Sequence, residues 1–325
     1  MSANAETTIK SGHPKGLGVL FTTEMWERFN FYGMRALLTL FLAKALLLGE
    51  QQASIIYGGF LGLSYLTPMA GGYISDKYLG NRNCIILGGL TMAIGQFLLF
   101  GSASIFTSNL DLAKNVMWLA LLVIILGNGF FKPNISSMVG QLYPENEKSK
   151  LDSAFTIFYM GINVGALLGQ TICPLLGDVE TTTVVNGAEK TIRDLTAFKW
   201  GFLAAGIAML IGTITFFILK NKYVVTPEGK AIGGKPKASQ RQDDDNVQAK
   251  FTSKAVAILI GLLVVFYFVF QYLSWDATSM PMTGSGIGGY FSALSTSPIK
   301  TYVYPFIYAS GCSLAIFILT DKSLT

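Results

Sequence analysis

The sequence of 325 residues has little charge, little cysteine and almost no histidine. Only 13% of its residues are charged, about half of the usual quarter, whereas 51% are hydrophobic. This composition excludes a disordered chain, a coiled coil and an ordinary cytosolic enzyme. The three cysteines, Cys84, Cys173 and Cys312, lie in apolar runs, so neither a disulfide framework nor a zinc site is predicted. The single histidine, His13, lies in a polar leader, which argues against histidine metal sites and Ser-His-Asp chemistry.

The hydrophobic residues are gathered into runs that are long enough to cross a membrane, which takes about 20 residues. The fold class is therefore predicted to be an all-α membrane protein. Before the first run, the polar leader has no apolar core or cleavage signal, so no cleaved signal peptide is expected. Eight runs are predicted to span: 18–48, 53–75, 84–106, 115–141, 153–177, 198–219, 254–275 and 300–320.

The basic residues divide unevenly between alternate loops, and this predicts the orientation. If the N-terminus is cytoplasmic, 15 of the 24 basic residues lie inside and four lie within the spans. The other five lie outside: Lys114, Lys190, Arg193, Lys199 and Lys300. Cytoplasmic loops of membrane proteins carry an excess of Lys and Arg, so both termini are expected in the cytoplasm. The net charge of +5 then follows from membrane orientation, and no nucleic-acid partner is expected.

A polar segment rich in Gly, Lys and Asp divides the chain. We interpret residues 221–253 as a cytoplasmic linker. A cytoplasmic leader (1–17) and a bundle of six helices (18–220) precede it, and two additional transmembrane helices (254–325) follow it.

The first apolar run carries four ionisable residues at membrane depth: Glu24, Glu27, Arg28 and Arg35. Such residues are costly in a membrane and indicate a functional site by default. At about 100° per residue the four form one stripe, which is expected to face a water-filled cavity or another helix. The alternative is that Glu24, Glu27 and Arg28 are only interfacial charges. Arg35 fits that alternative poorly, because apolar or small residues flank it on both sides.

The fourth run contains Lys132 in Gly127-Asn128-Gly129-Phe130-Phe131-Lys132-Pro133-Asn134. A lysine flanked by apolar residues needs a partner or water, or else it snorkels to the headgroups. Together with the four charges of the first run it gives a formal sum of +1, which would suit a zwitterion or an anion with a carboxylate. In a short inside loop, Asp76 and Arg82 follow Gly71-Gly72 and form either a gate latch or ordinary polar loop residues.

These segments resemble the proton-dependent oligopeptide transporter family of the major facilitator superfamily. The resemblance covers about residues 15–220 most strongly, and the two helices after the linker look like the extra pair of prokaryotic members. Its motifs are Glu24-Met25-Trp26-Glu27-Arg28, Phe31-Tyr32-Gly33-Met34-Arg35, the stretch from Gly71 to Gly80 with Ser75 where Ala is usual, Gly129-Phe130-Phe131-Lys132-Pro133-Asn134, and the stretch from Phe158 to Gly165.

The resemblance implies a fold and a role for each matching residue. The fold would be the N-terminal six-helix bundle of a major-facilitator-type transporter plus two extra transmembrane helices, with the family's C-terminal six-helix bundle absent from this sequence. No catalytic residue, metal or cofactor is implied, and protons would be the coupling ion. The implied site residues are Glu24, Glu27 and Arg28 for proton coupling; Tyr32, Arg35, Tyr65, Lys132 and Asn163 for peptide binding; and Gly71, Gly72, Asp76 and Arg82 for the gate or loop motif.

The expected function is proton-coupled symport of di- and tripeptides across a plasma membrane, the bacterial inner membrane. The alternative is a half-transporter that moves nothing and acts as an interaction subunit beside a C-terminal bundle or a second copy. An intramembrane enzyme is not expected, because the sequence has no His-Glu-x-x-His and no Gly-x-Ser-x-Gly motif.

Overall fold

The computed structural model describes residues 12–143, 145–185, 188–226, 229–235, 253–273 and 302–320. Most of the predicted linker, residues 236–252, lies outside the described residues, as does most of the leader. The long helices are α1 (Lys15–Leu40), α2 (Gly49–Ile74), α3 (Asn81–Ile105), α4 (Leu110–Gln141), α5 (Leu151–Gly177), α6 (Phe198–Tyr223), α8 (Ser253–Leu273) and α10 (Tyr304–Thr320).

Short elements extend or join the long helices. Two π-helical turns, Phe41–Ala45 and Ser75–Leu79, continue α1 and α2. Two 3₁₀ turns, Glu145–Lys150 and Leu195–Ala197, precede α5 and α6. Between α5 and α6, the strands β1 (Val179–Val185) and β2 (Ala188–Asp194) form an antiparallel hairpin.

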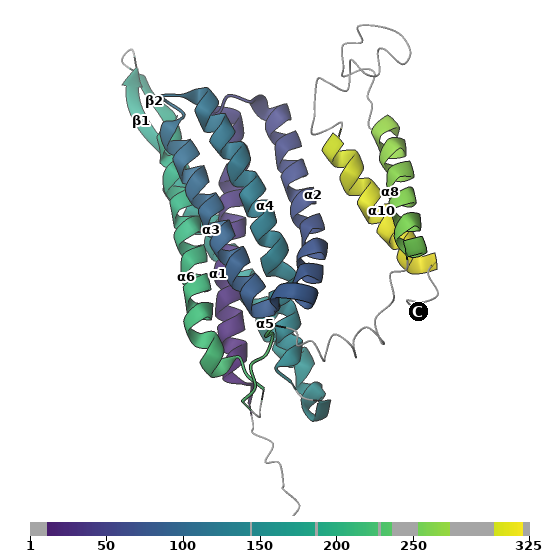
Figure 1. Cartoon of the computed structure of the whole chain (residues 1–325). Helices are drawn as coiled ribbons and strands as arrows, with labels where there is room; N and C mark the ends of the chain where they lie inside the picture. The colour runs from purple at the N-terminus through teal and green to yellow at the C-terminus, as the bar shows by residue number, and fades with distance from the viewer. Residues whose placement is uncertain are drawn as a thin grey trace, which may run out of the picture.

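The first six long helices pack side by side as one bundle (Figure 1). In this bundle α3 contacts α4 and α6, α1 contacts α5 and α6, and α2 contacts α4. By length and apolar composition, four helical segments among the described residues can cross a membrane: Asn81–Ile105, Leu110–Gln141, Lys148–Gly177 and Leu195–Tyr223. The helices α1 and α2 are as long as α6, at 26 residues each, and lie in the same bundle. The structure is therefore an all-α membrane protein, as predicted, with the charged residues of α1 held among more apolar helices.

A row of glycines brings α5 against α1. At Gly161, Gly165 and Gly169, one turn apart on α5, an added Cβ would lie within 3 Å of Phe21, Met25 and Phe29, respectively. No larger side chain fits at this crossing without moving a helix, because Met25 and Phe29 present backbone atoms there. The same contact places Gly165 against the Cβ of Arg28. The glycines thus set the position of the charged face of α1.

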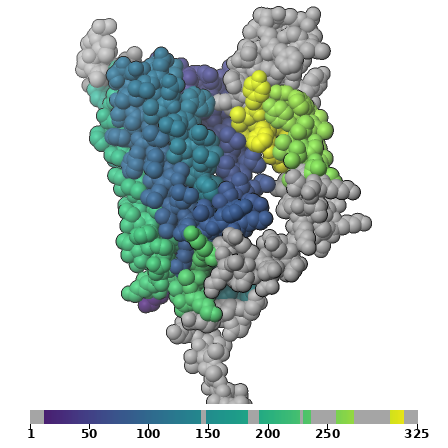
Figure 2. Space-filling model, viewed as in Figure 1, coloured from purple at the N-terminus to yellow at the C-terminus, as the bar shows by residue number. Residues whose placement is uncertain are grey.

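The helices α8 and α10 pair with each other and lie on one side of the bundle, where α10 contacts α2 (Figure 2). Tyr304 of α10 donates a hydrogen bond from its hydroxyl to the backbone carbonyl of Ile55, at 3.0 Å. Gly58 and Gly62, one turn apart on α2, face the side chains of Tyr304 and Ile307. The accessory pair is therefore attached through small residues of a single bundle helix.

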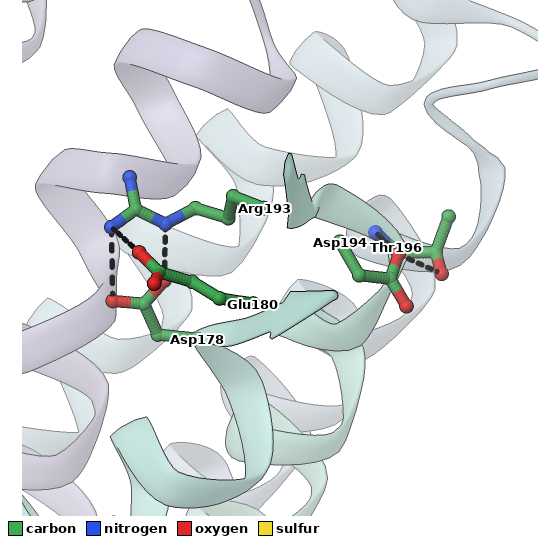
Figure 3. A network of polar contacts seen from close by, with 5 residues as sticks. All are labelled: Asp178, Glu180, Arg193, Asp194 and Thr196. Atoms are coloured by element: carbon green, nitrogen blue, oxygen red, sulfur yellow. Dashed lines mark hydrogen bonds and ion pairs between the residues drawn. The ribbon is translucent and has the colours of Figure 1, made fainter. Parts of the chain in front are cut away.

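The β-hairpin lies at the end of the bundle where α5 stops and α6 begins (Figure 1). At its base, the guanidinium of Arg193 pairs with Asp178 and lies 3.8 Å from a carboxylate oxygen of Glu180 (Figure 3). Asp194 accepts hydrogen bonds from the backbone N–H and the hydroxyl of Thr196, at 2.9 and 2.7 Å. These contacts fix the hairpin to Asp178, the residue that follows α5, and to the turn before α6. Only an outside loop was predicted here, and the hairpin is additional.

Candidate functional site

Glu24, Glu27 and Arg28 form a buried cluster on α1, which we call the acidic cluster. Their exposed fractions are 1%, 0% and 7%, so they are not charges on the surface of the bundle. Arg28 donates from Nε to Oε1 of Glu24 at 2.6 Å, and the same Nε lies 3.1 Å from Oε2 of Glu27. One guanidinium therefore serves two carboxylates, and the cluster has one negative charge in excess when both are ionised.

Three carboxylate oxygens of this cluster lack a hydrogen-bond donor among the described residues. They are Oε2 of Glu24 and both oxygens of Glu27, although Oε2 of Glu27 keeps its ionic contact with Arg28. A buried ionised oxygen without a donor is unfavourable, and binding a proton removes the charge. The cluster therefore has the composition of a proton-binding site.

Lys132 reaches the same region from α4. Its ammonium lies 4.1 Å from the centre of the Tyr65 ring, and it interacts electrostatically with Glu24, Glu27, Arg28 and Arg35. Tyr65 is on α2, which approaches α4 closely: a Cβ on Gly71 would lie 1.9 Å from the carbonyl oxygen of Gly129. The structure thus joins residues of three helices, α1, α2 and α4, that lie far apart in the sequence. A cation–π contact with Tyr65 also explains what stabilises Lys132 at this depth.

Arg35 is held by aromatic rings rather than by carboxylates. Its guanidinium carbon lies 5.2 Å from the ring centre of Tyr32, 5.5 Å from that of Phe31 and 5.6 Å from that of Tyr57. Its Nε donates a hydrogen bond to the Tyr57 hydroxyl at 2.9 Å. Tyr57, on α2, is absent from the residues that the sequence indicated, because a tyrosine in an apolar helix is unremarkable until its partner is known. We call Arg35 and Lys132 the basic pair.

Asn163 is the one predicted peptide-binding residue that the structure does not join to the others. It is exposed on α5, two residues before Gly165, and it makes no hydrogen bond within the described part of the chain. Tyr159, one turn earlier, is also exposed. The exposed side of α5 is therefore open for contacts that the described residues do not supply.

The loop motif contains one buried arginine with an unexpected set of partners. Arg82 donates from Nη1 to the Asn221 side chain at 3.0 Å and from Nη2 to the carbonyl of Lys220 at 3.2 Å. It also donates to the carbonyls of Val224 and Ile232. These acceptors belong to the C-terminal end of α6 and to the segment that follows it. Arg82 therefore caps α6 within the bundle, in the manner of basic residues at helix C-termini.

The other members of the loop motif have different positions. Gly71 and Gly72 lie against α4, near Gly129 and Pro133, whereas Asp76 is exposed. Gly80 has a φ of 76° and abuts the carbonyl of Gly234, which only a residue without a Cβ allows. The motif thus shapes the turn between α2 and α3 and the docking of the segment after α6. For metals, no group of three or more His, Cys, Asp or Glu side chains occurs in the described ranges.

An apolar helical bundle with buried charges on α1 and a half-buried lysine on α4 defines the class of the protein: a multi-pass membrane protein. The model of one family, the POT family (PTR2), matches residues 82–238. Relatives and solved structures of the same family match beyond these limits, and the chain belongs to the POT family.

Two relatives and one solved structure illustrate the similarity. The chain is 34% identical over 270 residues to a di-/tripeptide transporter of Lactococcus lactis subsp. cremoris, covering 80% of this chain and 47% of the relative. It is 35% identical over 233 residues to the uncharacterized transporter YclF of Bacillus subtilis (strain 168), covering 68% and 42%. A POT family transporter in complex with 5-aminolevulinic acid matches with a TM-score of 0.58 and 31% identity, covering 82% of this chain and 50% of that one. The chain spans about half the length of the relatives that it matches.

Proposed function

We propose that this chain is the N-terminal portion of a proton-coupled symporter of di- and tripeptides. The observation that carries the proposal is the separation of charges in the site. The acidic cluster is buried with one carboxylate in excess, and the basic pair faces aromatic rings with no directly contacting carboxylate among the described residues. In a membrane transporter, the carboxylate in excess can bind a proton while the two cations of the basic pair bind an anionic ligand.

The basic pair supplies the ligand side of this proposal. A peptide ends in a carboxylate, and Arg35 and Lys132 are the cations that would bind it, with Tyr32, Tyr65 and Asn163 available for backbone groups. Both the di-/tripeptide transporter of Lactococcus lactis and the ligand-bound relative carry names that fit this chemistry, since peptides and 5-aminolevulinic acid both combine an amine with a carboxylate.

The acidic cluster supplies the coupling side. While Arg28 is paired, an ionised glutamate is stabilised by its positive charge; separation from Arg28 in a dry site would favour the protonated form. Protonation of either glutamate would in turn release Arg28 from one of its partners. Proton binding would thus be linked to movement of α1 relative to its neighbours. Gly71, Gly72, Asp76 and Arg82 are proposed to transmit that movement at the turn between α2 and α3.

Transport also requires a second wall and a defined orientation. We propose that the exposed side of α5 is completed by a second helical bundle, as a C-terminal bundle or as a second copy, because rocking transport needs two bundles around one central site. We place the protein in the bacterial inner membrane with both termini in the cytoplasm, in line with the distribution of basic residues.

The proposal is tested with the full-length gene product in liposomes under an inward proton gradient. Accumulation of a radiolabelled dipeptide is measured with and without a protonophore. Lys132→Ala and Arg35→Ala should each lower the efficiency of uptake at least about 30-fold, because removing one member of a desolvated charge pair costs about 2–5 kcal/mol.

The matched control is Lys199→Ala. Lys199 is also half-buried and lies 5.2 Å from an aromatic ring, that of Trp200, but at the start of α6. Its removal should leave uptake unchanged. No proton-dependent accumulation of any dipeptide by the unmodified protein would reject the proposed function, and wild-type uptake in both variants of the basic pair would reject the assigned ligand site.

A further inference from the structure

We propose that Tyr57 is a positioning residue that orients Arg35, so that the site selects ligands ending in a carboxylate over ligands with a neutral end. This inference rests on the proposed function and adds a residue to it. The observation behind it is a side-chain hydrogen bond between two helices, from Nε of Arg35 on α1 to the hydroxyl of Tyr57 on α2, at 2.9 Å.

Arg35 has no other hydrogen-bond acceptor among the residues that the structure describes. A guanidinium can bind a carboxylate with two parallel hydrogen bonds, through either of two edges: Nε with one Nη, or the two Nη nitrogens. Tyr57 occupies the Nε edge. The edge formed by the two Nη nitrogens is left for a ligand.

The contacts with aromatic rings alone do not determine which edge of the Arg35 guanidinium is left for the ligand. Tyr32, Phe31 and Tyr57 lie 5.2–5.6 Å from the guanidinium carbon, and attraction to a ring face depends on distance more than on rotation of the guanidinium in its own plane. The Tyr57 hydroxyl supplies the directional contact. A hydrogen bond prefers an angle above about 150° at the donor, so it restricts that rotation.

The consequence is a fixed end-on geometry for the ligand. With its Nε edge occupied, Arg35 presents two donors in one plane, which matches the two oxygens of a carboxylate and not the single oxygen of a carboxamide. Because side chains that are held in place before binding lose less freedom when the ligand arrives, the hydrogen bond also strengthens binding. A ligand without a terminal carboxylate gains nothing from this arrangement.

The experiment compares a dipeptide with the same dipeptide amidated at its C-terminus, in counterflow exchange by the full-length gene product in liposomes. Tyr57→Phe keeps the ring and removes the hydroxyl. We expect its KM for the free dipeptide to rise about five- to tenfold, in the range for losing one typical hydrogen bond. Its kcat and its KM for the amide should stay within about twofold of the unmodified protein.

Tyr304→Phe is the matched control. It also removes a tyrosine hydroxyl that bonds to α2, at 3.0 Å from the Ile55 carbonyl, but it has no contact with Arg35 among the described residues. The ratio of the KM for the amidated dipeptide to the KM for the free dipeptide should be unchanged in this variant. Thermal unfolding of each variant in detergent gives the amount of folded protein for normalisation.

Arg35→Ala separates failure of this inference from failure of the proposed function. If Arg35→Ala abolishes the preference for the free carboxylate and Tyr57→Phe leaves it intact, Tyr57 does not orient Arg35. An equal rise of KM for both ligands in Tyr57→Phe would overturn the inference as well, because it would show a general structural role. If Arg35→Ala itself leaves the preference unchanged, the assignment of Arg35 to the carboxylate is wrong, and the inference falls with it. In the double variant, Tyr57→Phe should add nothing to Arg35→Ala.

Discussion

Arg28 and Arg35 lie two turns apart on α1 and have opposite surroundings. Arg28 is buried against the carboxylates of Glu24 and Glu27, whereas Arg35 is half-buried among the rings of Phe31, Tyr32 and Tyr57. The first arginine is needed by its own helix, because two buried carboxylates depend on it. The second is stabilised without being neutralised, so its charge stays available. Within one helix, the charge of Arg28 is therefore used in a buried ion pair, whereas the charge of Arg35 is available to bind a ligand.

The largest effect that tests this contrast is on stability. Arg28→Gln leaves two buried carboxylates unpaired and should lower the free energy of unfolding by about 3–5 kcal/mol, the usual result of breaking a buried ion pair. Arg35→Gln, which leaves no direct carboxylate contact unpaired among the described residues, should cost less than about 1 kcal/mol. Unfolding in detergent, followed by size exclusion, measures both.

A rescue experiment isolates the cause. Adding Glu24→Gln and Glu27→Gln to Arg28→Gln removes the unpaired charges and should restore most of the lost stability. Equal losses for Arg28→Gln and Arg35→Gln, or no rescue by the two glutamines, would contradict the distinction between the two arginines.

An intermediate effect is expected at Arg82, the third buried or half-buried arginine of the bundle. Its guanidinium binds carbonyl groups of α6 and the following segment, so Arg82→Ala leaves buried acceptors unpaired. The expected cost is about 1–3 kcal/mol. Limited proteolysis after α6 should also become faster. Lys77→Ala is the control, because Lys77 is exposed and lies 4.9 Å from the ring centre of Tyr73 on α2, and it should change neither quantity.

The smallest effect is expected at Arg193, at the base of the β-hairpin. This arginine is partly exposed and pairs with Asp178, which is also partly exposed. Partly exposed ion pairs contribute about 0.2–1 kcal/mol, so Arg193→Ala should shift the unfolding midpoint only slightly. A loss as large as that of Arg28→Gln would show that the hairpin is part of the folding core.

The sequence predicts the helices and the charged residues well because both stand out against an apolar background. Five charged residues are conspicuous in apolar runs: Glu24, Glu27, Arg28, Arg35 and Lys132. In the structure Lys132 interacts electrostatically with the other four, three of which form the acidic cluster. The hairpin was missed although a signal exists. A run of β-branched residues, from Thr181 to Val185, precedes Asn186-Gly187 in the sequence, and this dipeptide is a strong hairpin signal.

The remaining contacts depend on how helices pack, which no local pattern states. Tyr57 and Arg35 meet because α1 and α2 lie in one particular register, and Arg82 finds its acceptors about 140 residues further along the chain. Neither tyrosine nor arginine at these positions has a periodicity that identifies its partner. The sequence accordingly leaves the role of the loop motif open between a latch and polar loop residues, and the structure adds that one of its members, Arg82, caps α6.

We propose that the acidic cluster binds the coupling proton and the basic pair binds the ligand. Glu27→Gln is the variant that separates the two roles, because among the described residues both carboxylate oxygens of Glu27 are buried without a hydrogen-bond donor. In liposomes containing the full-length gene product, protonophore-sensitive accumulation of a dipeptide and gradient-free exchange are measured side by side and normalised to folded protein. We expect Glu27→Gln to lose accumulation and to keep exchange. Full accumulation by Glu27→Gln with an intact proton dependence would contradict it.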